Sequence, residues 1–136
     1  MRYLGLDLGT KTLGLAISDR LGTIASPYKV LRYTNEYILI EELIKIIKEE
    51  KVDELVLGLP KNMNGSLGFA SERSMNFKKN LEQKINIPIH LVDERLSTVE
   101  AEKLLISRDM SREKRKKIID GMAASIILDT YLNMKG

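Results

Sequence analysis

The 136-residue sequence predicts an α/β fold with a five-stranded mixed sheet flanked by helices. Three observations lead to this fold class. The first part of the chain holds three apolar segments joined by short turns, which is typical of an antiparallel three-stranded meander. The second part alternates two apolar strands with helical periodicity, which predicts parallel pairing through crossover connections. The length is that of one domain, so we expect residues 1–136 to form a single domain.

The first strand, within residues 2–11, carries a carboxylate inside an apolar segment. Alternation places three leucines on one face and Asp7 on the other, between Gly5 and Gly9. Because an unpaired buried carboxylate is costly, this position implies a metal, a cation or a set of hydrogen bonds as its partner. The alternative is an Asp that caps the turn after the strand.

Residues 12–18 and about 24–31 predict the second and third strands. The second strand has one face of leucine and isoleucine and another face of glycine, alanine and serine. These small residues would lie beside the space around Asp7. Pro27 has no N–H for the ladder, so the third strand is expected at the edge of the sheet.

The second part of the chain follows a helical period from Asn35, and either Asn35 or Thr34 can cap the first helix. The further elements are expected, in chain order, as a strand at residues 54–60, a helix at 68–84, a strand at 87–92, a helix from Ser97, and a last helix at 111–133 that is apolar almost all round. A helix of that kind is expected to be buried.

Acidic residues follow the fifth strand and interrupt the last helix. Asp93 and Glu94 stand at the carboxyl end of a strand, where open α/β sheets place their sites. Alternation does not decide which of the two faces the site, and Arg95 could instead form a surface ion pair with either. In the last helix we favour Asp120, since small neighbours let the helix approach the sheet, over Asp129 near the helix end.

The positive charge of the chain is concentrated in one segment. Residues 108–117 contain six basic and two acidic residues, a balance of +4, whereas the rest of the chain has a balance of −1. A basic segment of this kind suits a nuclease, because it can hold a phosphate backbone while acids hold metal. The alternative is a solvated helix start with no partner.

The acidic positions together predict a metal site. Clustered carboxylates repel one another, and hard divalent cations relieve that repulsion. The chain has no cysteine and one histidine, His90, within an apolar strand, so Mg²⁺ or Mn²⁺ is expected. Two such ions suit phosphodiester hydrolysis. With no long apolar run and no signal sequence, we expect a soluble cytoplasmic protein without a membrane partner.

Several motifs together carry a resemblance to the YqgF family, also called RuvX, whose members are pre-16S rRNA nucleases once proposed as Holliday junction resolvases. The motifs are Leu6-Asp7-Leu8-Gly9-Thr10-Lys11, Ser18-Asp19 with Ala25-Ser26-Pro27, Gly58-Leu59-Pro60 followed by Asn64-Gly65-Ser66, Asp93-Glu94-Arg95-Leu96-Ser97-Thr98, and Asp120-Gly121-Met122-Ala123-Ala124. They cover nearly the whole chain in the family's order.

The resemblance implies an RNase H-like fold related to RuvC resolvases and a role in maturing the 5′ end of 16S rRNA. It also implies that Asp7, Glu94 and Asp120 are the catalytic, metal-binding acids. The expected partners are nucleic acid, as precursor rRNA or branched DNA, and the ribosome or a pre-ribosomal particle; the oligomeric state stays open. Contacts with the nucleic acid are expected from Lys11, Arg95, Arg112, Lys114, Arg115 and Lys116.

The chain departs from the expected pattern at two places. Thr12 stands where the family commonly has a basic residue, so Lys11 would make that phosphate contact alone. RuvC-type enzymes have an acid at the end of the fourth strand, whereas this chain has Gly58-Leu59-Pro60, and Glu94 from the neighbouring strand would have to substitute.

Two readings from other classes remain open. The Asp7-Leu8-Gly9-Thr10 turn also resembles the first phosphate motif of the actin, Hsp70 and sugar-kinase fold, which needs two such domains around its nucleotide. The other reading is a catalytically silent module that binds nucleic acid or protein. DNA cleavage of the Holliday junction type is the alternative within the nuclease class.

Overall fold

The computed structural model describes residues 1–60, 68–94 and 112–135, with the side chains of 112–121 outside the description. Its strands are β1 (Tyr3–Leu8), β2 (Thr12–Ser18), β3 (Ala25–Arg32), β4 (Glu54–Leu59) and β5 (Ile89–Asp93). Its helices are α1 (Glu36–Glu49), α2 (Phe69–Glu82) and α4 (Arg112–Lys135). The helix expected from Ser97 lies outside the described residues.

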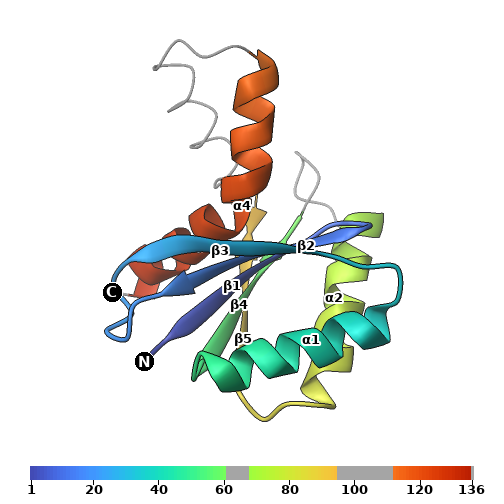
Figure 1. Cartoon of the computed structure of the whole chain (residues 1–136), viewed down its shortest axis with the longest axis vertical. Coiled ribbons are helices and arrows are strands. Elements are labelled where there is room, and N and C mark those ends of the chain that lie inside the picture. The colour runs from blue at the N-terminus through green and yellow to red at the C-terminus, as the bar shows by residue number, and fades with distance from the viewer. Residues whose placement is uncertain (61–67, 95–111, 136) are drawn as a thin grey trace.

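The five strands form one sheet in the order β3-β2-β1-β4-β5 (Figure 1). The pairs β1–β2 and β2–β3 are antiparallel, whereas β1–β4 and β4–β5 are parallel. This arrangement confirms the predicted meander and the two parallel strands. Pro27 lies on β3 at the edge, beside a shift of register in β2 between Leu15 and Ala16, as expected of a residue without an N–H.

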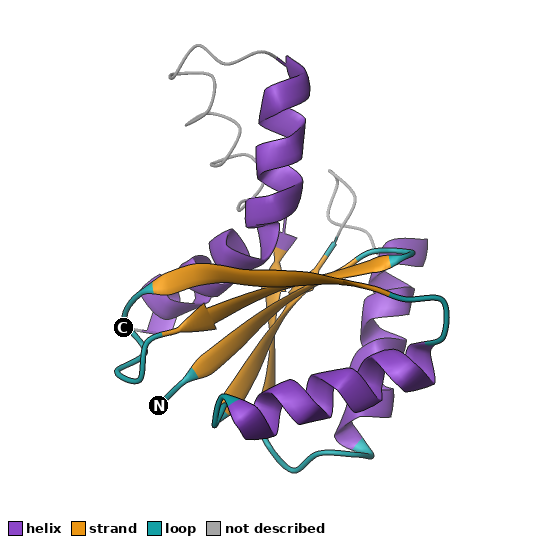
Figure 2. Ribbon diagram, viewed as in Figure 1, coloured by secondary structure: helices purple, strands orange, loops and turns teal. Residues whose placement is uncertain are grey.

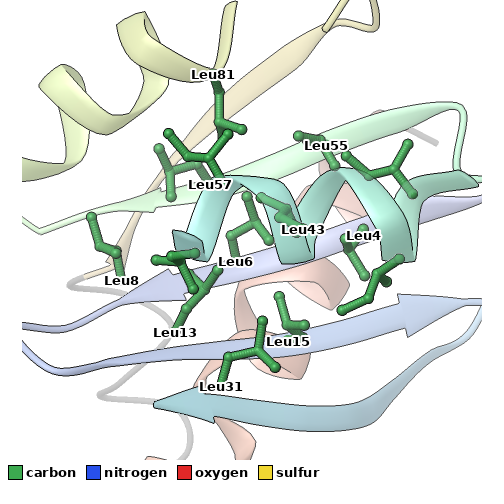
Figure 3. Close-up of a cluster of buried hydrophobic side chains, with 14 of the residues drawn as sticks. Leu4, Leu6, Leu8, Leu13, Leu15, Leu31, Leu43, Leu55, Leu57 and Leu81 are labelled. Carbon is green, nitrogen blue, oxygen red and sulfur yellow. The ribbon is translucent and has the colours of Figure 1, made fainter. Parts of the chain in front are cut away.

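Two separate apolar cores cover the two faces of the sheet. On one face, leucines of β1, β2, β3 and β4 pack against α1 and α2 (Figure 3). On the other face, Tyr3, Ala16 and Val56 pack against residues of α4. The alternation predicted for the first strand is therefore confirmed, because its leucines and Tyr3 belong to different cores.

Helix α1 begins where the sequence predicts it. The Asn35 side chain accepts hydrogen bonds from the backbone N–H of Tyr37 at 2.8 Å and of Ile38 at 3.3 Å. After the helix, Lys51 adopts a left-handed backbone with φ of 53°, and Val52 N–H donates to Ile47 O at 3.0 Å. This is the usual hydrogen bond that closes a helix end, with lysine in a position that favours glycine.

Helix α4 packs on the sheet over its later turns, while its first turns rise away from the sheet (Figure 2). A Cβ built on Gly5 would lie 2.8 Å from both Ala124 O and Leu128 Cβ, so only glycine permits this close approach. Ala124, Ile127 and Leu128 are buried, as expected for this helix, whereas Asp129 and Met134 are exposed. One face of α4 is buried and the other meets solvent.

No described helix is both long and apolar enough to cross a membrane.

Candidate active site

Asp7 and Glu94, here called the acid pair, meet at the carboxyl edge of the sheet. In the parallel ladder Leu6 pairs with Leu57, so the next residues along, Asp7 and Gly58, are neighbours on the same face. Glu94 directly follows β5, and its side chain forms a hydrogen bond with the Asp7 side chain. Two carboxyl groups 87 positions apart in the chain are thus brought into contact.

Gly58 provides the space through which Glu94 reaches Asp7. A Cβ on Gly58 would lie 2.8 Å from Glu94 Cγ and closer still to Glu94 Oε1. The same Cβ would lie 2.5 Å from Ile127 Cδ1 of α4. The Glu94 side chain therefore lies over β4 in the volume that any other residue at position 58 would occupy. The glycine itself is visible in the sequence, but only the structure shows that its missing side chain makes room for Glu94.

The environment of the acid pair favours a shared proton. Burial raises the pKa of Glu94 to about 8 from 4.5, and the charge of Asp7, the Asp7 hydrogen bond and the charge of Asp93 act in the same direction. Protonated Glu94 can donate to the Asp7 carboxylate, which removes one of two repelling charges. A hard divalent cation can bind the oxygen atoms of two carboxyl groups held this close, and it would then replace the shared proton.

The structure decides which residue of the Asp93-Glu94 motif meets Asp7. Val92 belongs to the core on the α4 face, so the next residue, Asp93, is directed by alternation to the other face. Asp93 pairs in the ladder with Leu59, and its charge still reaches Glu94. Glu94 is the one that forms the hydrogen bond with Asp7.

Asp120 belongs to α4 and precedes Ala124 by one helical turn. Asp7 and Ala124 both border Gly14: a Cβ on Gly14 would be 3.6 Å from Asp7 Cβ and 3.8 Å from Ala124 Cβ. The side chain of Asp120 lies outside the described residues. Asp129, the other acid of this helix, is exposed and accepts a hydrogen bond from Asn133 Nδ2 at 3.4 Å.

The turn between β1 and β2 places Lys11 at the same edge of the sheet. Gly9 N–H donates to Thr12 O at 2.7 Å. Tyr33, which follows β3, holds the turn with two hydrogen bonds: its hydroxyl donates to Gly9 O at 2.5 Å, and its backbone N–H donates to Lys11 O at 3.0 Å. The Lys11 side chain is exposed. It is therefore available to a ligand that approaches the acid pair.

The other predicted nucleic-acid contacts are placed only in part. Arg95 lies outside the described residues, as does the Asn64-Gly65-Ser66 motif. Arg112, Lys114, Arg115 and Lys116 belong to the first turns of α4, and their side chains lie outside the description. Among the residues that the structure describes, no group of three His, Cys, Asp or Glu has a metal-binding arrangement.

Asp19, from one of the motifs, and His90, the one histidine of the chain, lie elsewhere and have structural partners. Asp19 accepts hydrogen bonds from Thr23 N–H at 2.7 Å and Ile24 N–H at 2.9 Å, so it fixes the turn before β3. His90, in the apolar strand β5, is part-buried: its imidazole contacts Glu54 and stacks on Tyr131 with ring centroids 4.8 Å apart. Neither residue takes part in the acid pair.

The sheet order and the two parallel strands beside the antiparallel meander define an RNase H-like fold. Its likeness to solved structures supports this class. Thermus thermophilus RuvC in complex with a Holliday junction substrate has a TM-score of 0.61 at 12% identity, over 98% of this chain and 96% of that chain. The fowlpox virus Holliday junction resolvase has a TM-score of 0.55 at 16% identity, over 98% and 99% of the two chains.

The chain belongs to the RuvX family, described as Holliday junction resolvase, whose sequence profile matches residues 1–134. A relative in Bacillus subtilis is 51% identical over 136 residues, and one in Clostridium acetobutylicum is 48% identical over 133 residues, each match covering 98% of both chains. Both relatives bear the provisional name pre-16S rRNA nuclease. Membership in this family of nucleases, which hydrolyse ester bonds, confirms the class expected from the motifs.

Proposed function

We propose that the chain is a metal-dependent nuclease that hydrolyses a phosphodiester bond in the maturation of the 5′ end of 16S rRNA. The observation that carries the proposal is the buried, hydrogen-bonded acid pair at the carboxyl edge of the sheet. Relatives about half identical along their full length are named for precursor 16S rRNA, which supports this substrate. The single domain of residues 1–136 stays a prediction in line with the extent of the family match.

Asp7, Glu94 and Asp120 are the residues that we propose as catalytic ligands of Mg²⁺ or Mn²⁺. The support for Asp7 and Glu94 is the hydrogen bond between their side chains, which brings carboxyl oxygens of both residues close enough to bind one ion. The support for Asp120 is its place one turn before Ala124, because residues four apart lie on the same face of a helix. When bound there, a divalent ion lowers the pKa of a coordinated water and neutralises charge on the phosphodiester oxygens.

The chain's own groups bind and orient the substrate. Strand β1 fixes Asp7, and the space at Gly58 lets Glu94 lie beside it. Lys11 at the same edge would hold a phosphate next to the bond that is cut. The basic first turns of α4, with Arg112, Lys114, Arg115 and Lys116, would hold the adjoining backbone, and Arg95 is proposed as a further contact from its place in the sequence. Hydrolysis consumes one water and breaks one P–O bond, which leaves a phosphate monoester and a hydroxyl.

Cleavage of branched DNA is the second candidate, and the family's description favours it. The precursor rRNA would reach the enzyme as part of a ribosomal particle in the cytoplasm, whereas a four-way DNA junction would be a free substrate. The absence of cysteine from the chain does not distinguish an RNA substrate from a DNA substrate. A silent nucleic-acid-binding module is a third outcome that the assay must recognise.

The test is cleavage of a precursor 16S rRNA 5′ segment and of a four-way DNA junction, each with Mn²⁺ and with EDTA. Asp7→Asn and Glu94→Gln should each remove Mn²⁺-dependent cleavage, since both changes keep the shape of the side chain. Asp120→Asn should do the same, whereas Asp129→Asn, an exposed position on the same helix, serves as its matched control.

Each outcome assigns one function. Cleavage of the rRNA segment alone supports the proposal, and cleavage of the junction alone supports the resolvase alternative. Binding without cleavage of either substrate identifies the silent module. Variants at Asp7 and Glu94 that cut as fast as the parent would exclude the acid pair from the reaction.

A further inference from the structure

Gly58 of β4 lies in the sheet between Asp7 of β1 and the end of β5, beneath the acid pair. It is the residue of β4 that neighbours Asp7 on one side and, through its ladder partner Val92, the end of β5 on the other. Gly58 is buried, and its backbone φ gives no reason for glycine, since Gly22 is the described glycine with positive φ. The reason for glycine at this position lies in what its missing side chain leaves open.

Two side chains fill the volume above Gly58. One is Glu94, whose Cγ lies 2.8 Å from the position of a Cβ on residue 58, with Oε1 nearer. The other is Ile127 of α4, whose Cδ1 lies 2.5 Å from that position. Real Cβ contacts are almost never below 3.0 Å, so even alanine would force one or both side chains to move. Of the two atoms nearest to that Cβ, one belongs to the acid pair.

We infer that Gly58 is a positioning residue for the reaction: its missing side chain lets a carboxylate from the end of β5 occupy the site position above β4. This inference rests on the proposed function, because the acid pair is the site that Gly58 serves. A side chain at position 58 would push Glu94 away from Asp7 even though residue 58 itself touches no substrate. Misplacement of a reacting group by about 1 Å can lower a rate by about 10²-fold.

A corollary is that the carboxylate can be moved to residue 58 itself. The carboxyl group of an Asp is bonded directly to its Cβ, so its oxygen atoms lie close to that atom. Glu94 Oε1 also lies close to the position that a Cβ on residue 58 would take. Removal of Glu94 together with Gly58→Asp would therefore return an acid to nearly the same place. Ile127→Val removes the Cδ1 atom that would otherwise obstruct it.

The experiment compares the parent with the single variant Ile127→Val. Three further variants are made in the Ile127→Val background: Gly58→Ala, Glu94→Ala, and Glu94→Ala combined with Gly58→Asp. Thermal unfolding identifies the folded variants, cleavage gives kcat and KM, and calorimetry with Mn²⁺ gives the affinity of the site. Ile127→Val should retain activity. Adding Gly58→Ala should lower kcat by about 10²-fold with KM little changed and should weaken Mn²⁺ binding.

The rescue distinguishes positioning from packing. In the Ile127→Val background, Glu94→Ala alone should be inactive, and addition of Gly58→Asp should restore Mn²⁺ binding and part of kcat. If Gly58→Ala with Ile127→Val is folded, cuts like the parent and binds Mn²⁺ equally, the inference about Gly58 is wrong while the proposed function stands. If the parent itself cuts nothing, the proposed function fails, and a crystal structure of the Gly58→Ala, Ile127→Val variant decides the inference by whether Glu94 has left Asp7.

Discussion

Glu94→Gln should make the metal-free protein more stable at neutral and basic pH. The folded-state pKa of Glu94 is raised to about 8, from 4.5 for an unperturbed carboxyl, by burial first and then by Asp7. A group with a raised folded pKa binds its proton more tightly in the folded state. Its stabilisation is therefore complete below about pH 4.5 and is lost as the pH rises through about 8.

The size of the effect follows from the shift. One pKa unit is about 1.4 kcal/mol, so a shift of this size is on the order of 3 to 5 kcal/mol across the whole interval. For a chain of this length, 1 kcal/mol corresponds to about 4 °C in Tm. Glutamine has the same shape and can donate from its amide N–H to the Asp7 carboxylate without taking up a proton. The Glu94→Gln variant should therefore melt about 10 °C or more above the parent at pH 8, and near it at pH 4.5.

The assay is urea and thermal unfolding in EDTA at pH 4.5, 6.5 and 8. Glu41→Gln, a neutralised carboxylate on the exposed face of α1, is the control for a general effect of charge. A fall in stability with pH that is equal in the parent and in the Glu94→Gln variant would refute the reasoning. Added Mn²⁺ at pH 8 should raise the Tm of the parent more than that of the variant, because the ion binds the ionised pair in the folded state.

The remaining predictions concern a helix end and the basic segment. Lys51→Gly should raise the free energy of unfolding in urea by about 0.5 to 1 kcal/mol, because glycine adopts the left-handed φ of 53° without strain; Lys51→Ala, which keeps the strain, should not. Paired charge reversals Arg115→Glu and Lys116→Glu should weaken binding of single-stranded RNA and reduce its dependence on salt, regardless of sequence, in a filter-binding titration from low to high KCl. Equal salt slopes for parent and variant would remove these residues from the interface.

The sequence by itself determined the elements and the faces on which their residues lie. The alternation of leucine with Tyr3 and Asp7 fixed the two faces of β1, because a strand has a period of two and only one of its faces can meet α1 and α2. Asn35 determined the start of α1 through its side-chain oxygen, and Pro27 determined an edge strand through its missing N–H. These are local effects, which neighbouring residues in the chain decide.

Only the tertiary structure decided which acids meet. Between Asp93 and Glu94 the local pattern was ambiguous where the strand ends, and the choice depended on the neighbouring strand, which offers open space at Gly58. The partial exposure of α4 was likewise decided by packing, since Gly5 brings one face of the helix onto the sheet and leaves Asp129 in solvent. Contacts between residues distant in the chain depend on the register of strands and on volumes left empty, and neither is written in the periodicity of a single segment.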